Sequence, residues 1–97
     1  MLEKELEKKL VKGIRDLRGK AYKFTSPNNA GVPDRLVVLP TGEVFFVELK
    51  TDIGKLSTIQ SYQIRELRKL KQRVFILKGP QELENFLAFI ERRVKEK

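Results

Sequence analysis

Two acidic residues and a lysine stand at the ends of apolar runs in the middle of this sequence. Asp34 follows Gly-x-Pro and precedes one apolar run, while Glu48 and Lys50 flank Leu49 at the end of a second run. Residues two apart on a strand project from the same face, so a carboxylate and an ammonium would lie side by side there. The strand is too apolar to lie on the surface. These residue types, in a partly buried place, could bind a metal ion or carry out acid–base chemistry.

A short turn predicts where Asp34 lies relative to Glu48. Pro40-Thr41-Gly42 suits a three-residue hairpin loop, with proline at the first type I position and glycine in the left-handed one. This register pairs Leu39 with Glu43 and, counting back, Asp34 with Glu48. Directly opposed residues share a face, with Cβ atoms about 4.5–5.5 Å apart. Two carboxylates so placed repel each other, and a divalent metal ion would hold them together better than one ammonium does.

The missing residue types narrow the chemistry. The chain has no Cys and no His, which excludes disulfides, cysteine nucleophiles, Ser-His-Asp triads and zinc sites built on Cys or His. Any metal must be held by oxygen atoms, which favours Mg²⁺ or Mn²⁺. A carboxylate, a lysine or water must then act as the general base.

The charge balance predicts a polyanionic partner. Lys and Arg number 21 against 13 Asp and Glu, for a net charge of +8 and a pI near 9.9. Nucleic acid is the natural partner for such a surface, although a merely lysine-rich soluble protein has the same composition. No apolar run of about 18 residues and no signal-peptide pattern occurs. We therefore expect a single domain over residues 1–97 that does not contact a membrane and works in the cytoplasm.

Hydrophobic periodicity and turn residues predict seven elements. Helices are expected at 2–17, 57–71 and 81–94, and strands at 20–25, 35–39, 43–50 and 73–78. The order α-β-β-β-α-β-α indicates an α/β fold with a central mixed sheet flanked by helices. A right-handed crossover through the 57–71 helix makes strand 73–78 parallel to strand 43–50. In the 57–71 helix, a core face is predicted from Ile59, Tyr62, Leu67 and Leu70.

Two patterns resemble the signature of a known enzyme superfamily. Pro33-Asp34 followed by Glu48-Leu49-Lys50 resembles the PD-(D/E)XK nuclease motif, and Gly31-Val32-Pro33-Asp34 with Gln60 downstream is similar to its VRR-NUC branch, which includes small stand-alone phage and bacterial members. The resemblance runs from Glu3 to about Leu77 and implies a restriction-endonuclease-like fold. It also implies that the protein works in a bacterial or phage-infected cell. The family commonly has a glycine before the last strand, where this chain has Lys71-Gln72.

The resemblance implies a role for each site residue. Asp34, Glu48 and the Leu49 carbonyl would bind Mg²⁺ or Mn²⁺, and Lys50 would orient or deprotonate the attacking water. An early helix in this superfamily often adds an acidic residue to the metal site. Glu7 fits that place best by its distance from Gly19, and Glu3 is the alternative. Glu7 also has a plain interpretation as a surface carboxylate paired with Lys4.

Gln60 has two competing interpretations. Ser57 and Gln60 match a capping box, with Ser57 at the N-cap and Gln60 three residues on. The resemblance instead makes Gln60 an active-site residue that positions water or substrate. The two roles compete if one amide faces only one way.

The function implied is structure-selective cleavage of DNA. A small domain that cuts two symmetric strands would most simply be a homodimer, with four-way (Holliday) junctions as the first substrate and flaps or plain duplex as alternatives. The rival from another class is a non-catalytic, basic nucleic-acid-binding module in which Asp34, Glu48 and Lys50 form only a buried ion-pair cluster. Two carboxylates against one ammonium are poorly balanced for that purpose.

Overall fold

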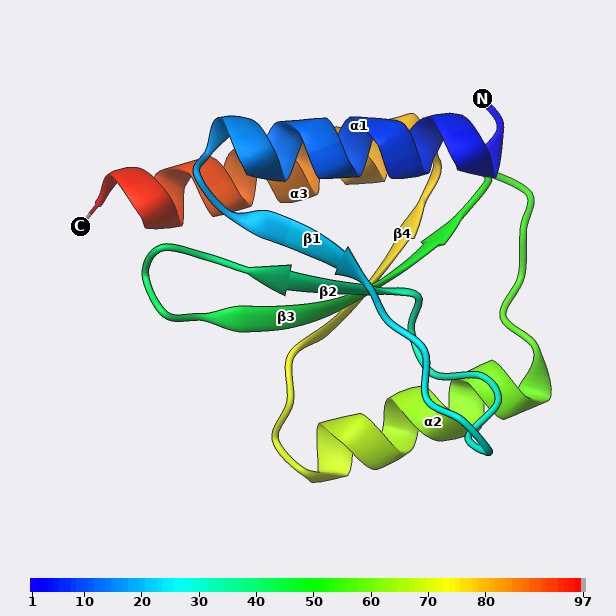
Figure 1. Ribbon diagram of the computed structural model, residues 1–97. Coiled ribbons are helices and arrows are strands. Elements are labelled where there is room, and N and C mark those ends of the chain that lie inside the picture. The colour runs from blue at the N-terminus through cyan, green and yellow to red at the C-terminus, as the bar shows by residue number, and fades with distance from the viewer. Residues whose placement is uncertain (97) are drawn as a thin grey trace.

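The computed structural model describes residues 1–96 and confirms the predicted order of elements (Figure 1). The seven elements are α1 (Glu3–Asp16), β1 (Lys20–Lys23), β2 (Arg35–Val38), β3 (Val44–Lys50), α2 (Thr58–Lys69), β4 (Val74–Lys78) and α3 (Gly79–Lys95). The fold is α/β, with a four-stranded mixed sheet flanked by helices. No helix among the described residues is both long and apolar enough to cross a membrane.

The sheet has the strand order β1-β2-β3-β4. β1 with β2 and β2 with β3 are antiparallel, whereas β3 and β4 are parallel, as the crossover through α2 predicted. Arg35 pairs with Val47 and Val38 with Val44, and the Leu39 N–H donates to the Glu43 carbonyl at 3.0 Å. The hairpin register predicted from the turn is therefore confirmed. It sets Asp34 opposite Glu48.

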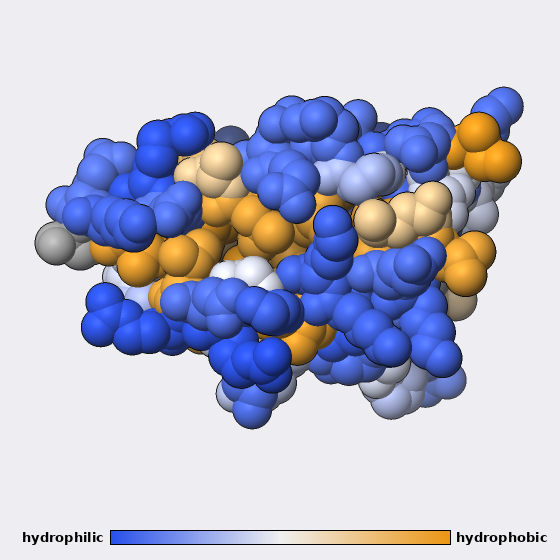
Figure 2. Space-filling view, turned by 90° about the horizontal axis from the view of Figure 1, so that it is seen from above, coloured by the Kyte–Doolittle hydropathy of each residue, from blue (hydrophilic) through white to orange (hydrophobic). Residues whose placement is uncertain are grey.

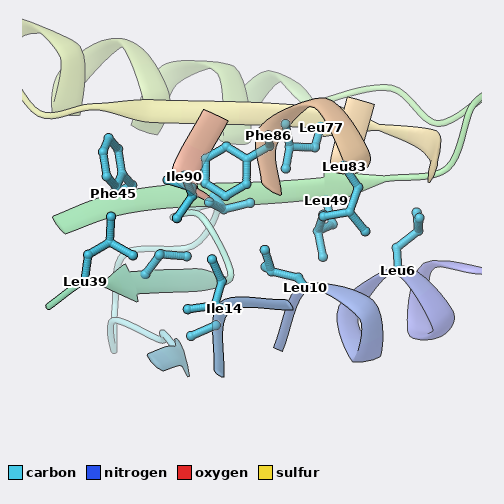
Figure 3. Close-up of a cluster of buried hydrophobic side chains, with 13 residues drawn as sticks. Leu6, Leu10, Ile14, Leu39, Phe45, Leu49, Leu77, Leu83, Phe86 and Ile90 are labelled. Carbon is cyan, nitrogen blue, oxygen red and sulfur yellow. The ribbon is translucent and has the colours of Figure 1, made fainter. Parts of the chain in front are cut away.

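The two faces of the sheet differ in what covers them. α1 and α3 lie together on one face, and α2 lies on the other (Figure 1). Side chains at 45, 47 and 49 of β3 point to the first face and are buried against α1 and α3, where Leu6, Leu10, Ile14, Leu83, Phe86 and Ile90 complete the core (Figure 3). Because side chains alternate along a strand, positions 46, 48 and 50 point toward α2. The main core therefore lies on one face of the sheet, and Glu48 and Lys50 lie on the other.

A glycine in α1 lets the two helices of the core layer approach each other. A Cβ built on Gly13 would lie 2.8 Å from the Leu87 methyl carbons of α3, so a larger residue would force the Leu87 side chain to move. α1 ends at Asp16, and Arg18, two residues later, is in the left-handed region, at φ 67°. Lys71, where the family commonly has glycine, is also left-handed, at φ 65°.

The predicted core face of α2 is wrong. Ile59 and Tyr62 are each 46% exposed and Leu70 is 69% exposed, whereas Ile64 is the buried residue of this helix. Gln60, Ile64 and Leu67 follow an i, i+4, i+7 spacing and share one side of the helix. α2 is thus turned by roughly a quarter turn from the predicted orientation, so that Gln60 rather than Ile59 faces the sheet.

The opposite end of the sheet is held by one carboxylate. Glu43 accepts hydrogen bonds from Arg93 Nε at 2.8 Å, from Arg73 at 2.7 Å and from the Thr41 hydroxyl at 2.8 Å. The Arg93 guanidinium, then that of Arg73, lowers the pKa of Glu43 to about 2. This cluster joins the β2–β3 turn to α3 and to the start of β4, at the other end of β3 from Glu48 and Lys50.

Candidate active site

Glu48 is the one buried charged residue among those the structure describes, at 1% exposure. Its Oε1 accepts a hydrogen bond from the Asp34 backbone N–H at 3.3 Å, and its Oε2 accepts one from Gln60 Nε2 at 3.3 Å. Lys50 Nζ lies 3.7 Å from Oε2. The four residues that the sequence placed together are therefore neighbours in space. They come from the start of β2, the end of β3 and the first turn of α2.

The contacts of Glu48 do not compensate for the free-energy cost of burying its charge. The pKa of its carboxyl is raised to about 7, first because burial penalises the charged form and next because the Asp34 carboxylate repels it. The Lys50 ammonium and the Asp34 N–H act in the opposite direction but are outweighed. A buried carboxylate beside a second carboxylate is a place where an added cation would be strongly favoured.

Pro33 leaves a backbone carbonyl free beside the carboxylates. The backbone groups of successive strand residues point alternately to the two neighbouring strands. The Phe46 N–H donates to the Arg73 carbonyl on the β4 side at 2.9 Å, so the Leu49 carbonyl points to the β2 side. The β2–β3 register, continued past Asp34, sets Leu49 opposite Pro33, and proline has no N–H to donate. The Leu49 carbonyl thus receives no ladder hydrogen bond from residue 33 and is available to a cation.

The donor set fits a hard divalent cation. Two carboxylates and one carbonyl are all oxygen ligands, and Mg²⁺ commonly binds to one or two carboxylates while keeping several waters. Residues 1–96 contain no cluster of three or more Asp, Glu, His or Cys side chains close enough to hold a metal by themselves. The site is thus suited to a partly hydrated ion and unsuited to a closed structural cage.

The two candidate glutamates of α1 are placed differently. Glu7 accepts hydrogen bonds from Arg35 at 3.1 Å and from Lys23 at 3.4 Å, rather than pairing with Lys4. Glu3 is the α1 carboxylate whose charge contributes to the raised pKa of Glu48. Glu3 is thus near enough to act on Glu48 through its charge, as the last of these causes, and the choice between Glu7 and Glu3 stays a prediction.

Gln60 performs both of the roles that seemed to compete. Its Oε1 accepts from the Ser57 N–H at 2.9 Å, and its own N–H donates to Ser57 Oγ at 3.2 Å, which completes the capping box. Its Nε2 meanwhile donates to Glu48 Oε2 at 3.3 Å. The amide has an acceptor at one end and a donor at the other, so one side chain caps the helix and orients the carboxylate.

Gly31 fixes the loop before Asp34 against the first turn of α2. Its φ is +91°, and a Cβ placed on it would lie 2.8 Å from the Ile59 carbonyl oxygen and 3.0 Å from the Gln60 nitrogen. A side chain there would push α2 away from the end of β3. The loop before Asp34 is therefore in direct contact with the helix that carries Gln60.

Arg35 is a residue whose role the sequence interpretation missed. It directly follows Asp34 and projects to the opposite face, where Nη1 donates to the Ala21 carbonyl at 3.3 Å and Nη2 to Glu7. Its buried Nε has no hydrogen-bond partner among the described residues. Strand alternation applied to Asp34 and Arg35 would have placed this cation behind the acidic centre.

Comparisons with known proteins agree with this geometry. "Putative nuclease p44" of Acyrthosiphon pisum secondary endosymbiont phage 1 is 50% identical over 68 residues, which cover 70% of each chain. A solved structure described as "VRR_NUC domain" has a TM-score of 0.83 and 26% identity, and the match covers 89% of this chain and 94% of that one. No family model matches the sequence.

We expect the metal-free protein to lose stability as the pH rises from about 5 to 8. The pKa of Glu48 is about 7 in the folded protein, against 4.5 for an unperturbed glutamate. Between these two values the unfolded chain has released a proton that the folded state retains. Stability is greatest below the unfolded pKa and declines as pH rises through the folded one, by roughly 3 kcal/mol in all. Urea denaturation in EDTA at several pH values measures this slope.

The Glu48→Gln variant keeps the shape of the side chain and removes its charge, so its stability should change much less between pH 5 and 8. Glu66→Gln, at an exposed carboxylate paired with Lys69 at 3.1 Å, serves as the control and should keep the wild-type slope. Identical slopes of stability against pH in all three proteins would show that the pKa of Glu48 is not raised in the folded state.

Proposed function

The chain belongs to the VRR-NUC domain family of the PD-(D/E)XK nuclease superfamily, and from this premise we propose that it cleaves DNA by hydrolysing phosphodiester bonds with Mg²⁺ or Mn²⁺. The observation that carries the proposal is the buried Glu48 carboxylate opposite Asp34, with only the Lys50 ammonium nearby. Burying a charge without full compensation is costly. A module that only binds nucleic acid has no need of such a pair.

Each residue of the site has a separate role in the proposed reaction. The carboxylates of Asp34 and Glu48 and the Leu49 carbonyl would hold the metal ion, and Glu3 of α1 would add negative charge near it. When bound, the ion supplies positive charge to offset the negative charge that develops on the phosphate. Gln60 Nε2 holds Glu48 Oε2 in place at 3.3 Å, so that the metal-binding carboxylate is oriented before substrate arrives.

Lys50 is the residue that would act on the attacking water. Its Nζ is 3.7 Å from Glu48 Oε2 and its side chain is 16% exposed, so it is anchored by the carboxylate yet open to solvent. In the proposed reaction Lys50 orients the water as an ammonium or takes its proton as a neutral amine, and the water oxygen bonds to phosphorus. The bond from phosphorus to the leaving oxygen breaks, and that oxygen takes a proton from solvent. Orientation of this kind is a large part of phosphoryl-transfer catalysis.

The substrate we propose is branched DNA, with four-way junctions first, cut by a homodimer. The net charge of +8 favours contacts with phosphates, which carry little sequence information. A two-fold dimer presents two identical sites that face symmetric strands. Selection by the shape of the branch is therefore consistent with the charge of the domain and with its family.

Alanine substitution of Asp34, Glu48 or Lys50 should abolish cleavage and leave DNA binding largely intact. Loss of either carboxylate removes negative charge that faces phosphate, so affinity at these positions should hold or rise. Supercoiled plasmid and labelled oligonucleotides with Mg²⁺, Mn²⁺ or EDTA provide the measurement. Cleavage by purified Glu48→Ala at the wild-type rate, or cleavage that continues in EDTA, would exclude the mechanism.

The same assay distinguishes the two glutamates of α1. Glu3→Gln should raise the Mg²⁺ concentration needed for half-maximal cleavage, whereas Glu7→Gln should leave it close to that of the wild type. If Glu7→Gln raises the Mg²⁺ concentration for half-maximal cleavage more than Glu3→Gln does, Glu7 is the α1 residue that serves the metal site.

Gln60→Glu should lower turnover by about tenfold or more in protein that remains folded. The variant keeps an oxygen to accept from the Ser57 N–H, but it places an oxygen in place of Nε2 beside Glu48 and loses a hydrogen bond to a charged group, worth about 1.5–3 kcal/mol. Ser57→Ala is the matched control, because it removes the cap at about 1 kcal/mol of stability and keeps the Gln60–Glu48 contact. Turnover that falls more in Ser57→Ala than in Gln60→Glu would reduce Gln60 to a capping residue.

Cuts mapped on four-way junctions of unrelated sequence should fall at symmetric positions on opposing strands. The free protein should sediment as a dimer, because one protomer presents one site. Flap, nicked and linear DNA are the comparison substrates. A strict monomer that cuts linear duplex as readily as a junction would end the substrate proposal and leave the metal chemistry standing.

A further inference from the structure

A basic hollow of about 550 Å³ lies along α1, outside the catalytic carboxylates. It is lined by five cationic side chains and one carboxylate, namely Lys4, Lys8, Lys12, Arg15, Arg35 and Glu7. On α1 these positions lie away from the side that meets α3, where Gly13 contacts Leu87 and Lys9 reaches Glu84 at 4.0 Å. Figure 2, which looks down on α1 and α3, shows hydrophilic side chains over both helices with an apolar band between them. The hollow is therefore a separate, charged feature of the fold.

The cations of α1 form a row. Lys4, Lys8 and Lys12 recur at i, i+4 and i+8, and Arg15 follows three residues later, so all four project from one side of the helix. At 1.5 Å per residue, the row from Lys4 to Arg15 is about 16 Å long. Like charges at this spacing destabilise a helix by a few tenths of a kcal/mol per pair. The row thus has a small cost that an anionic ligand would reverse.

Most of this charge has no partner within the protein. Lys12 pairs with Asp16 at 2.7 Å. Lys4, Lys8 and Arg15 form no ion pair within 4.0 Å with any residue of the described chain, 1–96. These three cations are therefore free to meet external anions.

Arg35 belongs to both β2 and the hollow. It begins β2 directly after Asp34, and its side chain, which is 16% exposed, projects to the opposite face of the sheet and lines the hollow. Glu7 accepts from it at 3.1 Å and also from Lys23 at 3.4 Å. Glu7 thus fixes the position of a cation that lines the hollow. A strand of DNA whose phosphate reaches Asp34 would pass around the β1 edge of the sheet to reach the hollow.

We propose that the α1 hollow binds the sugar-phosphate backbone of the DNA arm that leaves the active site. The inference rests on the proposed nuclease function and adds where the substrate lies. One strand of B-DNA advances 3.4 Å per phosphate, so a row of about 16 Å spans about five nucleotides. The unpaired cations and their regular spacing fit a regularly charged backbone. A compact acidic ligand would not need a row of this length.

The test is the salt dependence of DNA binding in EDTA, where no cleavage occurs. Lys8→Gln/Arg15→Gln removes two unpaired cations, and glutamine preserves helix propensity. Each lost phosphate contact changes the slope of log affinity against log salt by about 0.9. The slope should become shallower by about 1.8, which shrinks the difference in affinity between 50 and 200 mM salt by about twelvefold. The matched control is Arg92→Gln/Lys95→Gln on α3, which changes the net charge equally and should keep the wild-type slope.

The length of the DNA arm provides the second readout. The double variant should bind long-armed DNA more weakly than the wild type, and the two should converge as the arm is cut below about five base pairs. A slope equal to that of the wild type, an equal effect of the α3 control, or a deficit that does not depend on arm length would each overturn the proposal. A wild-type protein that binds with these properties but never cleaves would refute the nuclease function and leave the hollow as a DNA-binding surface.

Discussion

The structure must accommodate the burial of the Glu48 carboxylate. The carboxylate is 1% exposed, and its contacts at 3.3, 3.3 and 3.7 Å are all long for interactions with a charge. A buried charge with so little compensation destabilises a fold. The same strand supplies the remedy, because Phe45, Val47 and Leu49 are buried on its other face. Alternation along β3 thus places these core residues on one face of the strand and Glu48 and Lys50 on the other.

The position of α2 involves a polar contact as well as apolar burial. Gln60 reaches Glu48, and Gly31 contacts the backbone of the same helical turn. Gln60 and the buried Ile64 lie on one side of the helix, and Ile59 and Tyr62 are left at 46% exposure. The observed orientation leaves these two apolar side chains partly in water and keeps the amide on the carboxylate.

This balance explains what the sequence could predict and what it could not. The hairpin register followed from the Pro40-Thr41-Gly42 loop, because turn length and strand alternation leave no freedom in pairing. The face of α2 was wrong, because periodicity assumes that apolar residues are the buried ones, and a polar contact by Gln60 decided otherwise. The choice between Glu3 and Glu7 was also beyond the helical pattern. A helical wheel gives the direction of a side chain about the axis but not which end of the helix overlies Glu48.

Asp34 and Arg35 show why opposite charges can adjoin in sequence without cancelling. Successive residues at a strand project to opposite faces, so the carboxylate of Asp34 joins Glu48 while the guanidinium of Arg35 is held by Glu7 at 3.1 Å. Had both side chains shared one face, Arg35 would have compensated the charge of the carboxylate pair. The Glu7 contact therefore keeps this cation away from the two carboxylates. One strand end thus separates an acidic pair on one face of the sheet from a basic surface on the other.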